Sequence, residues 1–217
     1  MCNEYAREIA LAKFLDDLAK ARQTPFAWKD GRIPNDLDAK PSLKIRDPGL
    51  VLRLSGDTLV GEMLPWAWRG PNGKPVFNFR SEGRDFSASD RVLILATGFY
   101  EHSAPRKPGV KLMDRFFFTM RDHPWHWIAG IVKDDAFTML TTEPGPDVAP
   151  YHKRSIVALT PDAGAGWLTL DRPAFDVFAP PPSGTFEMTP LRRDGASISQ
   201  DRATNAPGTP GDLLADL

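Results

Sequence analysis

Residues 127–142 read WIAGIVKDDAFTMLTT and give the clearest structural signal in the chain. Two apolar runs, Trp127–Val132 and Phe137–Thr142, are rich in aromatic and β-branched residues, and Lys133-Asp134-Asp135 separates them. Short runs of this composition, bounded by turn residues, are typical of antiparallel strands. The stretch therefore predicts two neighbouring strands joined by a turn.

The same pattern recurs along the chain, with turn residues at 55–57 and 121–124. Six further strands are predicted in this way: Leu50–Leu54, Thr58–Leu64, Val92–Ala96, Arg115–Met120, Ile156–Leu159 and Phe186–Leu191. Because strands dominate, we expect an α+β fold of curved antiparallel sheets, barrel-like or strongly twisted, with helices around it.

Helical patterns are fewer. Glu4–Arg22 places four apolar side chains at helical spacing with charges between them, and Pro25 follows, which predicts an amphipathic helix. Thr24–Pro48 is rich in Pro, Asp and Gly and is expected to be a loop. Pro161–Leu170 and Pro173–Phe178 each open with Pro and are expected to be short helices.

The chain suits one domain with a loose end. It has 217 residues, 41% of them hydrophobic, which is enough for a sizeable core. Residues 179–184 form a proline-rich connector, and almost no large apolar residue follows Asp194. We therefore expect a folded domain over residues 1–192 and a mostly disordered tail over residues 193–217.

Charge and cysteine content narrow the class of protein. The formal net charge is −1, so phosphate binding would need a local basic patch. One cysteine rules out an internal disulfide framework and a cysteine-based zinc cluster, and it fits a reducing compartment. The first 15 residues contain no continuous apolar run, so we expect neither a signal peptide nor a membrane span, and a cytoplasmic protein.

That one cysteine, Cys2, directly follows Met1. Removal of Met1 would leave an α-amine and a thiol on adjacent carbons, with ordinary pKa values of roughly 8 and 8.5. Such a pair condenses with an aldehyde to an imine, and the thiol then closes a five-membered thiazolidine ring. The alternative is an incidental thiol at a frayed chain end.

Three polar clusters, at residues 78–82, 98–102 and 151–154, contain the candidate catalytic side chains. Glu101 follows Gly-Phe-Tyr, an apolar setting that raises a carboxyl pKa towards a general acid/base range. His152 suits proton transfer or a phosphate contact, and Asn78 suits orienting a reacting group. Each of these residue types is also common in purely structural roles.

Four side chains are candidates for DNA binding. Arg80 and Arg154 suit bidentate phosphate contacts, although arginines are more often solvated or paired with carboxylates. Trp66 and Trp68 suit stacking on exposed bases, although tryptophans are more often core residues. Phosphate-loop, dinucleotide, zinc-protease and serine-elbow motifs are absent from the sequence, and we expect no cofactor and no metal.

Taken in order, these pieces resemble the SRAP family, whose members sense abasic sites and crosslink to them. The matching pieces extend over roughly residues 1 to 192: MC at 1–2, LPWAW at 64–68, NFRSE at 78–82, GFYEH at 98–102, WIAGI at 127–131, FTMLTT at 137–142 and HKR at 152–154. Any one piece is a weak signal, whereas seven in register are specific.

The resemblance implies curved antiparallel strands with flanking helices and a groove for single-stranded DNA that contains an abasic site. It implies that Cys2 forms the thiazolidine, with Asn78 positioning it, Glu101 as general acid/base in formation and reversal, and His152 assisting proton transfer. Arg80 and Arg154 would bind phosphates, with Trp66 or Trp68 against a base. Methionine-removing peptidase and lyase activities are further implications, and a monomer is the default.

The chain departs from the family pattern at two places. Asn3 and Glu4 replace a small residue and an arginine, and Ser155-Ile156 replaces Met-Pro. Two other functions stay open: an N-terminal-nucleophile thiol peptidase or amidohydrolase, in which the α-amine is the base, and a non-catalytic module that binds single-stranded DNA.

Overall fold

The predicted pair of strands at residues 127–142 is present in the structure of the protein, a computed structural model that describes residues 2–21, 25–104, 113–170 and 177–191. Strands β12 (His126–Lys133) and β13 (Ala136–Thr142) pair antiparallel, with Lys133 opposite Ala136. Asp134 and Asp135 form the two-residue turn with φ of 51° and 55°. Positive φ at both positions matches the twist of a hairpin, and Asp tolerates it better than most residues.

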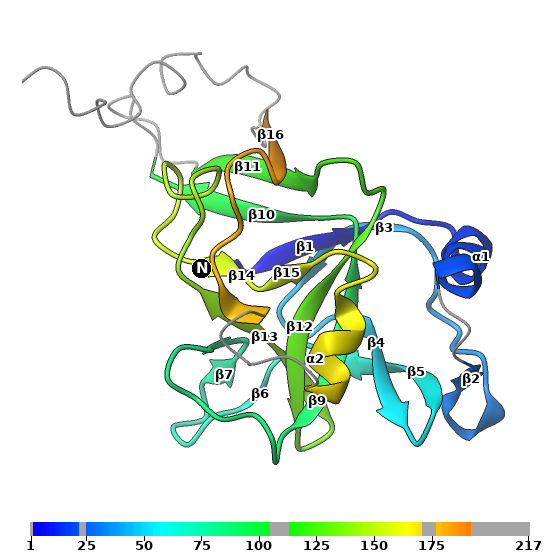
Figure 1. Ribbon diagram of the computed structural model, residues 1–217. Helices are drawn as coiled ribbons and strands as arrows, with labels where there is room; N and C mark the ends of the chain where they lie inside the picture. Colours follow the sequence, from blue (N-terminus) through cyan, green and yellow to red (C-terminus); the bar gives the residue numbers. More distant parts are fainter. Residues whose placement is uncertain (1, 22–24, 105–112, 171–176, 192–217) are drawn as a thin grey trace, which may run out of the picture.

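The strands form a five-stranded and a nine-stranded sheet, with one small two-stranded sheet beside them (Figure 1). The five-stranded sheet has the order β16 (Phe186–Leu191), β11 (Asp114–Met120), β10 (Gly98–Ser103), β1 (Glu4–Arg7), β3 (Lys40–Lys44). The nine-stranded sheet has the order β14 (Ser155–Ile156), β13, β12, β9 (Asp90–Ala96), β4 (Pro48–Ser55), β5 (Thr58–Pro65), β2 (Phe26–Trp28), with β15 (Ala158–Leu159) on β12 and β8 (Asn78–Arg80) on β13. The small sheet pairs β6 (Trp68–Arg69) with β7 (Pro75–Val76).

The nine-stranded sheet has an apolar core on each face. Alternate residues of β9 point to opposite sides, so Ile94 packs in an inter-sheet core and Leu95 in a helix-side core. The inter-sheet core joins this sheet to the five-stranded one. The helix-side core contains Phe14 of α1 (Leu11–Ala21) and Trp167 of α2 (Gly164–Thr169), which lies across β9 and β12 in Figure 1. The prediction of an α+β fold with curved, largely antiparallel sheets is confirmed, although the sheets do not close into a barrel.

The prediction of one helix over Glu4–Arg22 is wrong at its start. The helix is α1, and Glu4–Arg7 is strand β1, which pairs with β10 on one side and β3 on the other. All four residues of β1 are buried, so the strand shows no alternation of apolar and polar residues. The loop predicted at Thr24–Pro48 is also wrong, since it contains β2, β3 and the 3₁₀ turn η1 (Lys29–Gly31).

The later predictions need smaller corrections. The strand predicted at Ile156–Leu159 is split, because β14 pairs with β13 and β15 with β12, and Val157 between them bonds to Leu140 of β13 and to Ala129 of β12. The short helix predicted from Pro161 begins only at Gly164, and strand β10 was not predicted. Most of the helix predicted at Pro173–Phe178 and the whole tail at 193–217 lie outside the described residues. No helix within the described ranges is long and apolar enough to cross a membrane.

Candidate functional site

Cys2 is held inside the protein and does not lie at a frayed end. Its side chain is 1% exposed and packs in the inter-sheet core. The thiol donates to the carbonyl oxygen of Glu4 at 3.2 Å, and the Asn78 side-chain amide donates to the carbonyl oxygen of Cys2 at 2.7 Å. Chain ends stay ordered only when they are tied down in this way.

Strand β10 presents Glu101 to Cys2. Gly98 lets the start of β10 lie close to β11, because a Cβ at this position would be 2.7 Å from the carbonyl oxygen of Phe118. Glu101 is 1% exposed, and its carboxylate accepts a hydrogen bond from the backbone nitrogen of Cys2. Burial raises the pKa of Glu101 to about 7, as its apolar neighbours predict.

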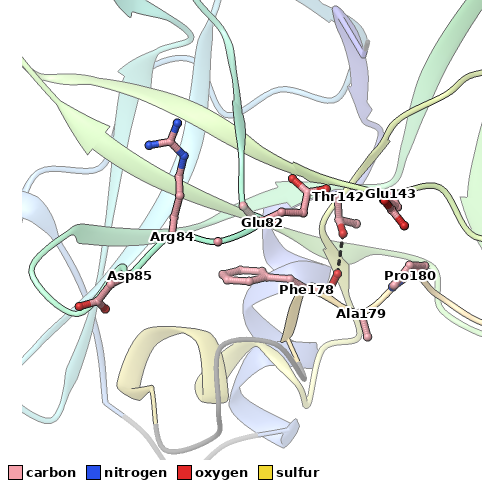
Figure 2. Close-up of a pocket in the computed structure, with 10 residues that line it drawn as sticks. Glu82, Arg84, Asp85, Thr142, Glu143, Phe178, Ala179 and Pro180 are labelled. Atoms are coloured by element: carbon pink, nitrogen blue, oxygen red, sulfur yellow. Dashed lines mark hydrogen bonds between the residues drawn. The ribbon is translucent and has the colours of Figure 1, made fainter.

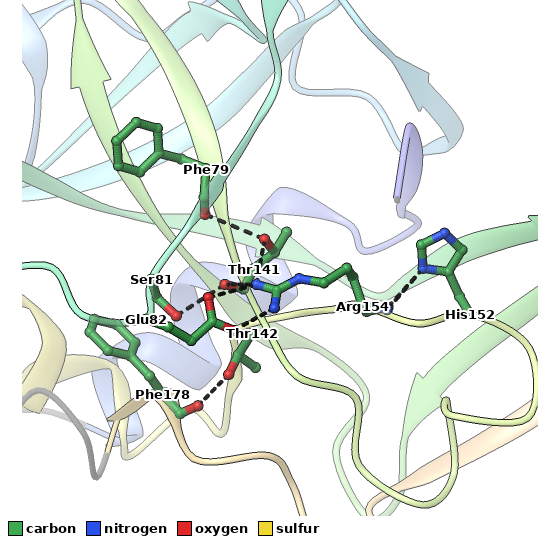
Figure 3. Close-up of polar contacts among 8 residues, drawn as sticks. All are labelled: Phe79, Ser81, Glu82, Thr141, Thr142, His152, Arg154 and Phe178. Atoms are coloured by element: carbon green, nitrogen blue, oxygen red, sulfur yellow. Dashed lines mark hydrogen bonds and ion pairs between the residues drawn. The ribbon is translucent and has the colours of Figure 1, made fainter.

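His152 lies beside Glu101, with 3.9 Å between His152 Nδ1 and Glu101 Oε2. The same Nδ1 is 3.1 Å from both the backbone nitrogen and the carbonyl oxygen of Arg154 (Figure 3). A neutral ring can therefore accept from the N–H, and a protonated ring can donate to the carbonyl. Burial lowers the pKa of His152, so the ring is neutral at neutral pH.

Asn78 reaches Cys2 because β8 adds to β13 in parallel, with Asn78 opposite Met139. Arg80 follows on the same short strand and is exposed. The structure thus brings together Cys2, Asn78, Glu101 and His152 from four different segments. It leaves Arg80 as an exposed cation two residues from Asn78.

Arg154 is placed differently from the phosphate-binding prediction. It is 8% exposed and makes a bidentate ion pair with Glu82, in which Nη2 is 2.9 Å from Oε2 and Nη1 contacts Oε1. Nη2 also donates to the carbonyl oxygen of Thr141 at 2.8 Å (Figure 3). These contacts commit the guanidinium to joining β13 with the segment after β8.

Replacing Arg154 by Met should lower the free energy of unfolding by about 1–3 kcal/mol, because Glu82 and the Thr141 carbonyl lose their donor. Arg154→Lys keeps the charge but not the bidentate geometry, so its free energy of unfolding should lie between those of the unmodified protein and Arg154→Met. Urea unfolding measures both variants. Unchanged stability together with a large loss of DNA affinity would restore the phosphate-binding role.

The two tryptophans lie in the core, so the prediction of a base-stacking platform is not supported by their placement. Trp66 is fully buried, donates its indole N–H to the carbonyl oxygen of Phe77 at 2.8 Å and stacks on Phe137. Trp68 is 7% exposed and packs in the helix-side core. Ala67 between them has φ of 90°, and the two side chains enter different cores.

A cavity of about 610 Å³ is lined on one side by residues 81–85, which follow β8 (Figure 2). Phe178, Ala179 and Pro180 give it an apolar wall, and Thr142 Oγ1 donates to the Phe178 carbonyl oxygen at 2.6 Å. The ionisable side chains that line it are Glu82, Arg84, Asp85 and Glu143. Because Arg154 balances Glu82, two carboxylates, Asp85 and Glu143, remain against the Arg84 guanidinium, which disfavours a phosphate there.

One contact at Cys2 was missed by sequence reasoning. Glu4 was interpreted only as the loss of a positive charge, yet its carbonyl oxygen accepts the Cys2 thiol. No local pattern marks this role, because it depends on how the chain turns into β1. Within the described residues, no three His, Cys, Asp or Glu side chains lie close enough to hold a metal ion.

Comparisons with known proteins point to one family. A sequence model described as SOS response associated peptidase (SRAP) matches residues 63–194. A search of curated protein sequences found no significant match.

Several solved structures share the fold. A protein from Bacteroides thetaiotaomicron superposes with a TM-score of 0.66 at 16% identity, covering 89% of this chain and 93% of that one. A phage-related protein from Bordetella bronchiseptica gives 0.63 at 19% identity, covering 88% and 95%. A second protein from Bordetella bronchiseptica gives 0.60 at 20% identity, covering 88% and 99%. At these identities the likeness shows a common fold.

Proposed function

The chain belongs to the SOS response associated peptidase (SRAP) family, a family associated with DNA damage, and from that premise we propose that it captures abasic sites. Cys2, once Met1 is removed, would form a thiazolidine with the ring-opened aldehyde of an abasic site in single-stranded DNA. The crosslink would shield the lesion.

One observation carries the proposal: the Glu101 carboxylate contacts the backbone nitrogen of Cys2. Removal of Met1 converts that nitrogen from an amide into an α-amine, which is the nucleophile of imine formation. A buried carboxyl group, whose pKa desolvation raises, then lies in contact with the reacting nitrogen.

In the first step the amine adds to the aldehyde carbon and gives a carbinolamine. Glu101 in its acid form donates a proton to the carbinolamine oxygen, which leaves as water, and the nitrogen lone pair forms the iminium double bond. The neutral His152 ring next to Glu101 can relay the proton that moves from nitrogen to oxygen as the carbinolamine forms, and Glu101 is left as a carboxylate for the next step. Asn78 fixes the Cys2 carbonyl and so limits rotation of the residue that reacts.

In the second step the thiol closes the ring. Burial, followed by the nearby Glu101 charge, raises the pKa of the Cys2 thiol well above its ordinary value, so the thiol enters the reaction protonated. Sulfur adds to the iminium carbon, the C=N electron pair returns to nitrogen, and the thiol proton passes to the Glu101 carboxylate. The products are a thiazolidine and a regenerated acid.

The raised thiol pKa also separates the proposal from a thiol peptidase. A peptidase needs the thiolate to attack an amide, whereas ring closure on an iminium ion needs only the thiol. Arg80 supplies an exposed cation for the phosphate beside the lesion.

The test mixes the purified protein with single-stranded DNA that contains one abasic site and looks for an adduct that survives denaturation. Mass spectrometry first confirms that Met1 is absent. Cys2→Ala should keep an imine that only borohydride traps, and it should lose the stable adduct completely. Persistence of the stable adduct in Cys2→Ala, or its absence in the unmodified protein, contradicts the proposal.

A further inference from the structure

The side chain of Glu4, two residues after the reactive end, is clamped by donors from three strands. It is 4% exposed. Oε1 accepts from Ser42 Oγ at 2.5 Å and from Arg115 Nη2 at 2.7 Å, and Oε2 accepts from Arg115 Nε at 3.2 Å. His102 Nε2 lies 3.4 Å from Oε2. An arginine fork on a carboxylate fixes direction as well as distance.

This clamp lies on the face of the five-stranded sheet opposite to the Cys2 site. Side chains alternate along β10, so Glu101 points to the inter-sheet core and His102 to the other face. Arg115 is paired with His102 across β10 and β11, and its guanidinium lies 3.7 Å above the Tyr100 ring. The aromatic ring holds the guanidinium in place beneath Glu4.

The clamp also neutralises the charge that replaced a family arginine. Although burial raises it, hydrogen bonds from His102 and Ser42 and the adjacent Arg115 lower the pKa of Glu4 to about 2. Glu4 is therefore ionised at neutral pH and balanced by Arg115. Arg115 compensates the negative charge of Glu4 within the clamp, so that charge does not face a DNA phosphate.

The backbone of Glu4 connects this clamp to the reactive thiol. The Glu4 carbonyl oxygen accepts the Cys2 thiol at 3.2 Å. Strand β1 pairs with β3 from Glu4, opposite Lys44, but with β10 only from Tyr5, so on the β10 side the Glu4 side chain adds the restraint that backbone pairing does not give. A shift of Glu4 moves the acceptor that orients the sulfur.

On the basis of the proposed function, we propose that Arg115, acting through Glu4, is a positioning residue that orients the Cys2 thiol for ring closure. Arg115 does not touch the reacting atoms. Its removal should leave imine formation by the amine and Glu101 near the unmodified rate, while closure of the ring slows about tenfold, the effect expected for a misplaced reacting group.

The first measurement uses a small aldehyde, acetaldehyde, so that DNA affinity does not enter. Borohydride reduces an imine and leaves a thiazolidine unchanged, and the fraction reduced over time gives the partition between the two. Arg115→Met should accumulate reducible imine, and Arg115→Lys should restore part of the closure. Glu4→Gln should behave like Arg115→Met, and the double variant should be no worse than either.

Arg53→Met is the matched control. Arg53 forms an ion pair with Asp90 at 2.8 Å on the nine-stranded sheet and also contacts Glu62, away from Cys2. Arg53→Met should lower the melting temperature without changing the partition between imine and thiazolidine. An equal change of partition in the Arg53 and Arg115 variants means general destabilisation and overturns the inference.

A second measurement needs no aldehyde: the rate at which iodoacetamide alkylates Cys2 in the folded protein. The thiol, 1% exposed in the unmodified chain, should react about tenfold faster in Arg115→Met. Unchanged alkylation and unchanged partition overturn the inference. If Arg115→Met is alkylated faster but the unmodified protein forms no DNA adduct, the proposed function is contradicted, whereas the role of Arg115 in positioning Cys2 is supported.

Discussion

Glu101→Gln should slow formation of the DNA adduct by about 10²–10⁴-fold, the contribution typical of a positioned general acid/base. Glutamine keeps the size of the side chain and a hydrogen-bond acceptor for the Cys2 nitrogen, but it cannot deliver a proton to the leaving oxygen. Glu101→Asp keeps the acid at a shorter reach and should recover part of the rate. Quenched time courses on denaturing gels measure all three proteins.

The same substitution should stabilise the protein in alkaline solution. Folding raises the pKa of Glu101 from 4.5 to about 7, so the folded state binds the proton more tightly than the unfolded state. The free energy of unfolding therefore falls as the pH rises from about 4.5 through 7, and the cost of the buried charge is complete above that range. Glu101→Gln removes this cost, up to about 3 kcal/mol at pH 8 and almost none at pH 4.

This stability comparison requires chains that retain Met1, as mass spectrometry can verify, because removal of Met1 moves the terminal ammonium onto the Cys2 nitrogen and so changes the pKa of Glu101. Glu62→Gln is the matched control. Glu62 is also 4% exposed, but Lys29 at 2.6 Å and Arg53 stabilise its charge. The Glu62→Gln protein should be less stable, and it should form the DNA adduct at the unmodified rate. A Glu101→Gln protein that captures at the unmodified rate would show that another group supplies the proton.

Trp66→Ala should lower the free energy of unfolding by about 3–5 kcal/mol, a large part of the stability of an ordinary domain. The substitution empties the contact between Tyr5, Phe77 and Phe137 and leaves the Phe77 carbonyl without its indole donor. Trp66→Phe keeps an aromatic ring and should lose roughly half as much. Chemical denaturation checks both variants.

The same variants separate a core residue from a base-stacking platform. A platform would lose about 1–3 kcal/mol of DNA binding with little change in stability. Trp28→Ala is the control, because Trp28 is only partly buried at the sheet edge and should cost less stability. Weakened DNA binding by a Trp66 variant that unfolds at the unmodified denaturant concentration would show that the platform prediction was correct.

Several of the strands that the sequence predicts have turn residues directly beside their ends. Asp134-Asp135 forms the turn between β12 and β13, and turn residues also lie next to β4, β5 and β11. Strand β1 carries no such mark. It buries Glu4 and Arg7 beside Tyr5 and Ala6, and the partners that make burial of Glu4 favourable lie as far away as Arg115.

The candidate site divides in the same way. The resemblance to the family, and not the type of each side chain, implied that Cys2, Asn78, Glu101 and His152 act together, and in the structure these four residues lie near one another. Residue type could not distinguish an exposed arginine from one held in a buried ion pair. Arg154 is buried and hydrogen-bonded to Glu82, whereas Arg80 is exposed, and this difference depends on the pairing of β8 with β13.

Strand β1 has a consequence for how the protein matures during synthesis. It is synthesised before both of its neighbours, β3 and β10, and β10 begins only at Gly98. Until β10 is synthesised, β1 lacks one of its two partner strands, and the residues before it are accessible to a processing enzyme. We therefore expect a separate aminopeptidase to act more readily before residues 98–103 are synthesised than after the sheet has formed, when Cys2 is 1% exposed.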